Sequence, residues 1–235
     1  MKPDLNKSTA RLAGVFYLIV ILTGFFSLAY IPGKLFFWDN PQKTFNEITN
    51  HEFLFRLSIV SSAICYIAFL MLPLILYKLL HNVHDSYAKV MVALTVVSVP
   101  ISLTNLLNKF SVLSLISHDN YSNIYSAQEL NSQVMFYLNQ YDNGILIAMI
   151  FWGLWLFPFG YLVYKSGAIT KLLGVLLMLG CFGYLINFTG NMLIHNYSSL
   201  GISKYISLPA SLGEIGTCLW LLIFGIKKNK ETSDI

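Results

Sequence analysis

The residues best suited to chemistry are ionisable and amide side chains within long apolar stretches. Glu214 is the clearest case, because it lies ten residues after Lys204 and thirteen before Lys227, or about 15 Å and 20 Å along a helix. A carboxylate at that depth in a bilayer must either be protonated or find a cation. Such groups usually face other helices or a water-filled cavity, so Glu214 is the first candidate for a ligand-binding residue.

Two cations are candidate partners of Glu214. Arg56 opens the second apolar stretch, and Lys109 lies twenty residues, or about 30 Å along a helix, beyond Lys89. Amides occur at similar depth at Asn105, Asn108, Asn187 and Asn191. Together these residues predict a polar pocket biased toward the outer leaflet. The structural alternative is that Arg56 and Lys109 snorkel to the interface and that the asparagines only bridge helices.

Signatures of metal, phosphate or nucleophilic chemistry are not found in the sequence. It has no Gly-rich phosphate loop, no nucleophile elbow and no His-Glu-x-x-His zinc motif. Cys65, Cys181 and Cys218 lie in apolar runs without metal-ligand spacing. His81 and His84 are two histidines only, which fits a solvated loop better than a metal site. We therefore expect no metal site and no cofactor, and catalytic residues stay unknown.

The composition indicates a membrane protein. Charged residues make up 11% of the 235 residues and hydrophobic residues 56%, whereas soluble domains carry about 25% charged residues. The net charge of +4 is small and is not distributed as in a nucleic-acid-binding protein, so the expected partner is the lipid bilayer. A helix needs roughly 20 apolar residues to cross a bilayer. Six stretches qualify: residues 12–31, 57–79, 90–113, 144–164, 172–193 and 208–226.

These stretches predict one all-α integral membrane domain, residues 1–235, with six transmembrane helices. The even connections and the two ends carry ten lysines and arginines, and the odd connections carry four. The richer side is normally cytoplasmic, which predicts that both termini are cytoplasmic. The alternative is a cleaved signal peptide ending near Ser27-Leu28-Ala29, which would leave five spans and an outer N-terminus.

Two long outer connections contain helix-start signals. Asn40-Pro41 suits a cap followed by a first-turn proline, and Ser126 with Glu129 suits a capping box. Both segments are predicted to be short amphipathic helices on the outer surface. Within the spans, Pro73, Pro100 and Pro158 are expected to kink helices or free carbonyls.

Two further expectations concern packing. Trp155 lies too deep to anchor at an interface and is expected to face other helices. Gly174, Gly180 and Gly183 are expected to permit close helix contact rather than to bind a ligand.

The sequence resembles the uncharacterised bacterial membrane family known as DUF4386. The resemblance covers nearly the whole chain and is carried by Ala10-Arg11-Leu12-Ala13-Gly14-Val15-Phe16-Tyr17-Leu18, Phe55-Arg56-Leu57, Gly160-Tyr161-Leu162-Val163-Tyr164-Lys165-Ser166-Gly167, Leu173-Gly174, Pro209-Ala210-Ser211-Leu212-Gly213-Glu214 and Leu219-Trp220-Leu221-Leu222. It implies a bacterial cytoplasmic membrane but supplies no reaction.

The chain departs from the family pattern at three places. The family has an acid early in the second span, where this chain has Ser61-Ser62. It tends to have an arginine in the third span, at Thr95 here, and a histidine entering the fourth, at Tyr141 here. If these groups carry the family's activity, this member has lost or changed it.

Three functions remain open at this point. The leading hypothesis is a non-enzymatic membrane protein that binds or transports a small molecule or lipid. The second is a membrane-embedded enzyme acting on lipid headgroups, which would need Asn191, His195 and Asp142 to converge with Glu214. The third is a scaffold or partner subunit.

Overall fold

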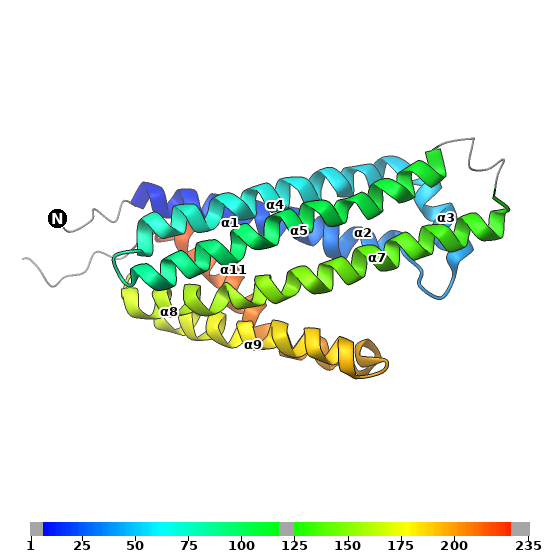
Figure 1. Ribbon diagram of the computed structural model, residues 1–235. Helices are drawn as coiled ribbons and strands as arrows, with labels where there is room; N and C mark the ends of the chain where they lie inside the picture. Colours follow the sequence, from blue (N-terminus) through cyan, green and yellow to red (C-terminus); the bar gives the residue numbers. More distant parts are fainter. Residues whose placement is uncertain (1–6, 118–124, 227–235) are drawn as a thin grey trace, which may run out of the picture. The chain divides into compact units, whose positions relative to one another are not determined.

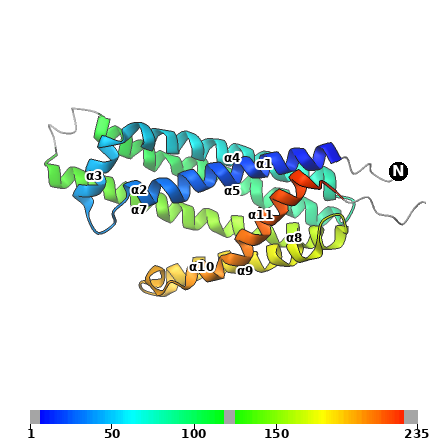
Figure 2. The same ribbon diagram turned by 180° about the vertical axis from the view of Figure 1, so that it is seen from behind.

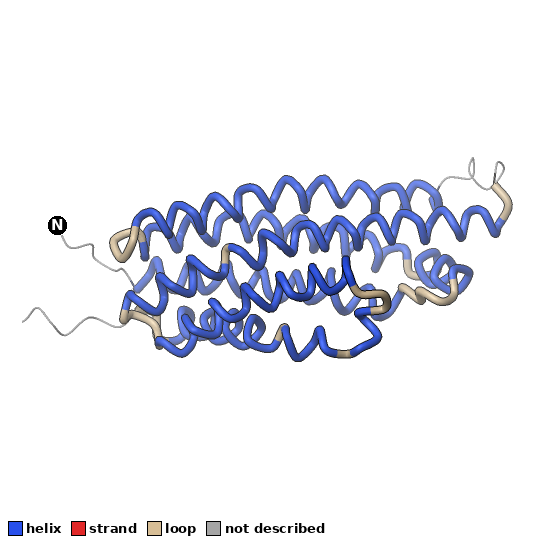
Figure 3. Tube along the Cα trace, turned by 60° about the horizontal axis from the view of Figure 1, so that its bottom comes forward, coloured by secondary structure: helices blue, strands red, loops and turns tan. Residues whose placement is uncertain are grey.

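The structure is a computed structural model that describes residues 7–117 and 125–226 (Figure 1). The tail lysines counted for orientation, Lys2, Lys227, Lys228 and Lys230, lie outside the described residues. Helix is the regular structure of the described part, which contains no strand (Figure 3). The elements are α1 (Lys7–Phe25), a π-helical segment η1 (Phe26–Tyr30), α2 (Ile31–Leu35), α3 (Pro41–Asn50), α4 (Glu52–Leu80), α5 (Asp85–Ser117), α7 (Ala127–Leu154), α8 (Leu156–Ser166), α9 (Lys171–Leu193), a 3-10 segment η2 (Tyr197–Leu200), α10 (Ile202–Ile206) and α11 (Leu208–Ile223).

Six helical segments are long and apolar enough to cross a membrane: Lys7–Leu35, Glu52–Leu80, Asp85–Ser117, Ala127–Ser166, Lys171–Leu193 and Ile202–Ile223. Each overlaps one predicted stretch, so the predicted all-α fold class is confirmed. The observed helices are mostly longer than the predicted spans because polar end residues continue the backbone hydrogen bonding beyond the apolar run.

The exposed surface is rich in large apolar side chains, and several polar side chains are buried among the apolar ones. Leu193 is 82% exposed and Phe53 is 79% exposed, whereas Lys109 is fully buried. Other buried polar residues include Ser58, Ser62, Ser98, Ser102, Asn105, Asn187 and Thr217. A water-soluble domain normally buries apolar side chains and leaves charges outside. In lipid, large apolar side chains can face outward, while buried polar side chains share hydrogen bonds between helices.

The chain forms two compact units. Unit 1 comprises Met1–Leu18, Ala68–Val99 and Ile147–Ile235, and unit 2 comprises Ile19–Ile67 and Pro100–Leu146. Helices α1, α4, α5 and α7 contribute residues to both units. Unit 2 has an apolar core built from these buried side chains: Ile31, Leu35, Phe36, Ile48, Phe55, Ile59, Val112, Leu113, Val134, Met135 and Leu138.

The two predicted helix starts in the outer connections are present in unit 2. The Asn40 side chain accepts a hydrogen bond from the Lys43 N–H at 2.9 Å and caps α3. The Ser126 N–H donates to the Glu129 carboxylate at 2.8 Å, while the Glu129 N–H donates to Ser126 Oγ at 3.3 Å. This capping box starts α7, which then runs without interruption into the predicted fourth span. Gly144 lies within this continuous helix and packs against Asn105 of α5.

The three intramembrane prolines act differently. Pro73 and Pro100 lie within α4 and α5, which remain continuous α-helices. Pro158 lies just after the boundary between α7 and α8 at Trp155. Proline has no N–H for the carbonyl four residues earlier and its ring clashes there, so Leu154 loses its usual partner. The long helical segment is therefore divided at Trp155 into α7 and α8.

In unit 1, helices α9 and α11 pack antiparallel in close contact (Figure 2). A Cβ on Gly180 would lie 2.7 Å from Ala210 Cα, and one on Gly183 would lie 2.5 Å from the Ile206 carbonyl oxygen. A Cβ on Gly174 would lie 2.7 Å from the Gly160 carbonyl oxygen of α8. The predicted role of these glycines in close helix contact is confirmed.

Candidate functional site

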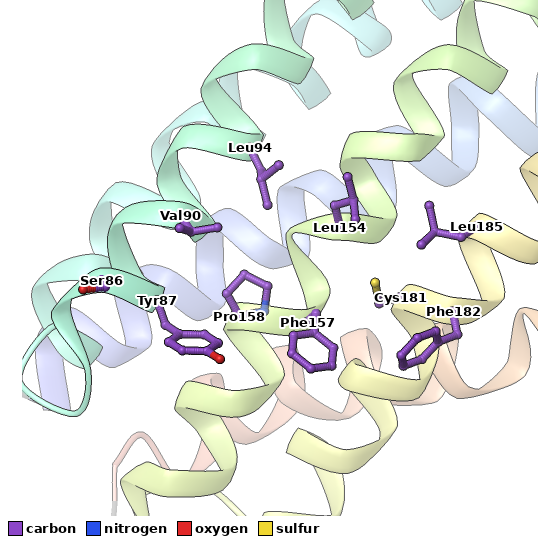
Figure 4. A pocket seen from close by; sticks show the side chains of 10 residues that line it. All are labelled: Ser86, Tyr87, Val90, Leu94, Leu154, Phe157, Pro158, Cys181, Phe182 and Leu185. Carbon is purple, nitrogen blue, oxygen red and sulfur yellow. The ribbon is translucent and has the colours of Figure 1, made fainter.

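Unit 1 contains an apolar groove of about 600 Å³ between α5, the α7–α8 junction and α9 (Figure 4). Its lining is mostly aliphatic and aromatic: Ser86, Tyr87, Val90, Leu94, Leu154, Phe157, Pro158, Cys181, Phe182 and Leu185. The volume falls in the usual range of ligand pockets, roughly 300–1,000 Å³. Such a surface suits a hydrocarbon chain rather than a charged solute.

The groove ends in aromatic and polar side chains near the start of α5. The Tyr87 ring stacks on the Tyr161 ring of α8, with centroids 4.4 Å apart. His84 packs edge-on against Tyr87 at 4.7 Å, and the Lys165 ammonium lies 6.0 Å from the centroid of the Tyr161 ring. Ser86 and Tyr87 line the groove itself. This end therefore offers hydroxyl, imidazole and ammonium groups beside an apolar surface.

Local polar contacts fix the start of α5. The Lys89 ammonium pairs with the Asp85 carboxylate at 2.6 Å, and the Tyr77 hydroxyl of α4 donates to the same carboxylate at 2.8 Å. The Tyr77 ring also stacks on His81, with centroids 5.2 Å apart. These contacts join the end of α4 to the first turn of α5 and so position the polar end of the groove.

The α7–α8 junction forms the middle wall of the groove. Pro158 and Phe157 face it (Figure 4). Trp155, at the junction, is almost fully buried and packs on Phe159, Phe69 and Tyr17, with ring centroids 5.1, 5.2 and 6.3 Å away. The prediction that Trp155 faces other helices is confirmed. The same short segment thus contributes to the groove and to the aromatic core of unit 1.

Glu214 belongs to unit 1 and lies among phenols. Its carboxyl group interacts with the Tyr17 hydroxyl of α1, and Tyr184 of α9 is close enough to interact with it electrostatically. The Tyr17 hydroxyl nevertheless has no partner at hydrogen-bond geometry among the described residues. The predicted pairing of Glu214 with Arg56 or Lys109 would join unit 1 to unit 2, and it stays a prediction.

Asn187 and Asn191 of unit 1 are occupied by local hydrogen bonds. The buried Asn187 amide donates to Ser207 Oγ at 2.8 Å and accepts from the Tyr197 hydroxyl at 2.9 Å. Asn191 is exposed and donates to the Asn187 carbonyl at 2.7 Å. Asn187 therefore ties α9 to the η2–α10 connection and to the start of α11, which is the bridging role described above as the structural alternative.

Lys109 is the centre of a buried polar cluster in unit 2. Its ammonium donates to Ser58 Oγ at 3.3 Å and lies 4.4 Å from the centroid of the Tyr141 ring. Asp142 is close enough for electrostatic attraction, but the pair is not in salt-bridge contact. Lys109 does not snorkel out of unit 2, because it is fully buried there.

Asn105 and Asn108 extend this cluster along α5. Asn105 donates to the Tyr141 carbonyl at 2.8 Å and accepts from Asn108 at 2.9 Å. Arg56 is also in unit 2 but is exposed, and it pairs with Glu52 at 2.5 Å and with Ser117 Oγ at 3.2 Å. The structure thus brings Lys109, Asn105 and Asn108 together. Lys109 and Asn105 both contact Tyr141, and Asn108 donates a hydrogen bond to Asn105.

Two of the three departures from the family pattern lie in this cluster. Ser62 donates to the Ser58 carbonyl at 2.9 Å and its hydroxyl interacts with the Tyr141 hydroxyl. Tyr66 contacts the same tyrosine, with hydroxyl oxygens 3.5 Å apart. The third departure, Thr95, is buried in unit 1 and donates to the Met91 carbonyl at 3.1 Å. Ser58, Ser62 and Tyr141 therefore place neutral hydroxyl groups in the buried cluster around Lys109.

Sequence reasoning missed the groove because its lining consists of residues that are ordinary in membrane helices. Two signals were available. Pro158 indicated a helix break, and His84 lies three residues before Tyr87, so both fall on one side of the start of α5. Among the described residues no group of three or more His, Cys, Asp or Glu is arranged to hold a metal ion.

Comparison with known proteins gives a family but no activity. An uncharacterized protein of Archaeoglobus fulgidus is 34% identical over 87 residues, which are 37% of this chain and 49% of that protein. The match therefore spans about half the length of the relative. No solved structure matches the chain. The sequence pattern of the domain of unknown function DUF4386 matches residues 12–225. The expected resemblance is confirmed, and the chain belongs to the DUF4386 family.

Proposed function

We propose that this protein binds an anionic membrane lipid, with one acyl chain in the groove of unit 1 and the headgroup at the His84–Tyr87–Lys165 end. The observation that carries the proposal is the continuity of the apolar groove with these polar side chains. Ser86 and Tyr87 belong to the groove lining, and Tyr87 contacts His84 and Tyr161. An amphiphile is the ligand class that needs both surfaces at once.

Charge favours an anionic headgroup. Lys165 and Lys171 flank the α8–α9 connection, and Lys78 and Lys89 flank the α4–α5 connection. Basic residues next to spans are attracted to the anionic leaflet on the cytoplasmic side, by about 1 kcal/mol each. We propose that this end of unit 1 faces the cytoplasm, in agreement with the orientation expected from the lysine and arginine distribution.

The topology belongs to the same proposal. The chain crosses a cell membrane six times, with both termini in the cytoplasm. Single cysteines introduced at Ser8 and Ser126, in a background with Cys65, Cys181 and Cys218 replaced by serine or alanine, test this. A membrane-impermeant maleimide should label Ser126→Cys in intact cells and Ser8→Cys only after lysis. Labelling of Ser8→Cys in intact cells would contradict the orientation.

Lipid binding is tested by native mass spectrometry of the detergent-purified protein titrated with phosphatidylglycerol or phosphatidylcholine. Wild type should retain phosphatidylglycerol at least tenfold more tightly. Leu94→Trp fills the groove and should weaken binding of both lipids about tenfold. Val96→Trp, two residues away on α5 and outside the groove lining, is the matched control and should bind normally.

A separate variant tests whether the polar end of the groove recognises the lipid headgroup. Lys165→Gln should reduce the preference for phosphatidylglycerol over phosphatidylcholine while leaving binding of phosphatidylcholine unchanged. Equal retention of both lipids by wild type, or equal losses in Leu94→Trp and Val96→Trp, would show that only nonspecific annular lipid occupies this surface. The proposal would then be wrong.

A further inference from the structure

We propose a second site in unit 1, independent of the groove, at which Glu214, Tyr17, Tyr184 and Thr217 bind one sodium ion. These residues come from three helices, α1, α9 and α11. They supply one carboxylate and three hydroxyl oxygens, which are ligands of the type that hard cations prefer.

Two buried hydroxyl groups, one on α1 and one on α11, carry the argument. Tyr17 is 1% exposed and Thr217 is fully buried, and neither hydroxyl has a hydrogen-bond partner among the described residues. Buried polar groups are nearly always satisfied, and each exception requires an explanation. A bound cation would explain both, since each oxygen could serve as a ligand.

The local packing turns the helix faces that carry these residues toward each other. Thr217 follows Glu214 by three residues on α11, so both lie on one face of the helix. Cys218, the next residue, donates its thiol to the Gly14 carbonyl of α1 at 3.6 Å. Tyr17 follows Gly14 by three residues on α1. The Gly14–Cys218 contact therefore turns the faces that carry Tyr17 and Glu214 toward each other.

Glu214 also lacks a counter-charge within its own surroundings. Its described interactions are with phenols, and none of the three ion pairs among the described residues includes it. One carboxylate balances one positive charge. A divalent cation would leave net positive charge in a low-dielectric interior, which is costly, so a monovalent cation fits the single carboxylate.

Aromatic rings hold Tyr17 in place from the other side. Its ring packs on Trp155 and Phe159, with centroids 6.3 and 6.4 Å away. A fixed tyrosine offers its oxygen without further ordering, which is how a site of few ligands gains affinity. The nearby tryptophan also provides a fluorescence signal for the experiment.

The test uses the full chain purified in detergent, with unfolding followed by tryptophan fluorescence. Sodium chloride should raise Tm by several degrees in a concentration-dependent way, relative to choline chloride at the same ionic strength and pH. Glu214→Gln should abolish the sodium effect. Glu52→Gln, which removes an exposed carboxylate of unit 2, is the control and should keep it.

Two milder variants keep the test decisive if Glu214→Gln does not fold. Tyr17→Phe and Thr217→Val each remove one oxygen and should raise the sodium concentration needed for half of the Tm shift about tenfold. Binding of radioactive sodium to wild type should saturate at one ion per chain. Equal Tm values in sodium, potassium and choline chloride would overturn the proposal, and would indicate a carboxyl group neutralised by a proton. Leu94→Trp should leave the sodium response unchanged. The lipid-binding proposal and the sodium proposal can therefore fail independently of each other.

Discussion

The ammonium of Lys109 lies 4.4 Å from the centroid of the Tyr141 ring, although the lysine is fully buried and its nearest carboxylate, Asp142, is not in salt-bridge contact. The contact joins α5 to α7 within unit 2. An ammonium over an aromatic face gains roughly 2 kcal/mol when both are desolvated. Burial of a charge without a contacting carboxylate costs several kcal/mol. Because the cost of burying the charge exceeds the gain from the ring, removal of the charge is expected to stabilise the protein.

Lys109→Met should stabilise the protein in detergent by about 1–2 kcal/mol, because methionine keeps the length of the side chain and removes the buried charge. Chemical unfolding followed by tryptophan fluorescence measures the change in free energy. Lys34→Met, at an exposed position of α2 in the same unit, should change stability by less than about 0.5 kcal/mol. A clear loss for Lys109→Met would mean that the ammonium is paired more strongly than its contacts with Ser58 and Tyr141 indicate.

Tyr141→Phe should cost about 1 kcal/mol, because the ring face remains and the lost hydroxyl interacts with Ser62 and makes a long contact with Tyr66 at 3.5 Å. Tyr141→Leu should cost about 2–3 kcal/mol, since it removes the ring and leaves space beside Lys109. In the Lys109→Met background the difference between the two variants should shrink, and a double-mutant cycle measures that coupling. An unchanged difference would show that Tyr141 acts through packing alone.

Gly183→Ala should destabilise the contact between α9 and the end of α10 by about 1–3 kcal/mol, because the new methyl group would lie 2.5 Å from the Ile206 carbonyl oxygen. Gly33→Ala is the matched control, since no atom lies within 4 Å of the added Cβ in α2, and it should be neutral or slightly stabilising. Thermal unfolding in detergent compares the two. Similar losses in both variants would argue against close backbone contact as the reason for glycine at position 183.

Asn187→Ala should cost about 2–3 kcal/mol, because it leaves the buried Tyr197 hydroxyl and Ser207 without their amide partner. Asn191→Ala should cost less than about 1 kcal/mol, since that side chain is exposed and makes one bond to a backbone carbonyl. The same unfolding assay separates them. If Asn191→Ala alone impaired ligand binding without affecting stability, Asn191 would have a functional role that its present contacts do not indicate.

The helices were predictable because the length of an apolar run depends on local sequence only. The capping residues Asn40 and Ser126 also act within one turn, and both begin helices as expected. The continuity of α7 was not expected, because the polar segment after Ser126 was predicted to be a separate short helix on the outer surface and the apolar segment from Gly144 was predicted to be a span. Gly144 did not interrupt the helix, since it packs directly on Asn105.

The candidate site was harder to predict because partners of buried groups come from other helices. Lys109 and Glu214 lie within helical segments that are long and apolar enough to cross a membrane, yet a single sequence does not show that Lys109 lies over Tyr141 or that Glu214 lies near Tyr17. Those neighbours depend on helix rotation and on the close α9–α11 contact. The groove depends on how far apart three helices pack, and no residue pattern in the sequence indicates that spacing.

The glycine surface of α9 also has a consequence for biosynthesis. Until α10 and α11 are present, a nascent chain would expose Gly180 and Gly183 to lipid, and small residues on a membrane helix promote pairing with another helix. A chain truncated before Ile202 should therefore tend to dimerise through α9 or to be degraded. In the folded protein α10 and α11 cover that surface, so these later segments protect α9 from association with the wrong partner.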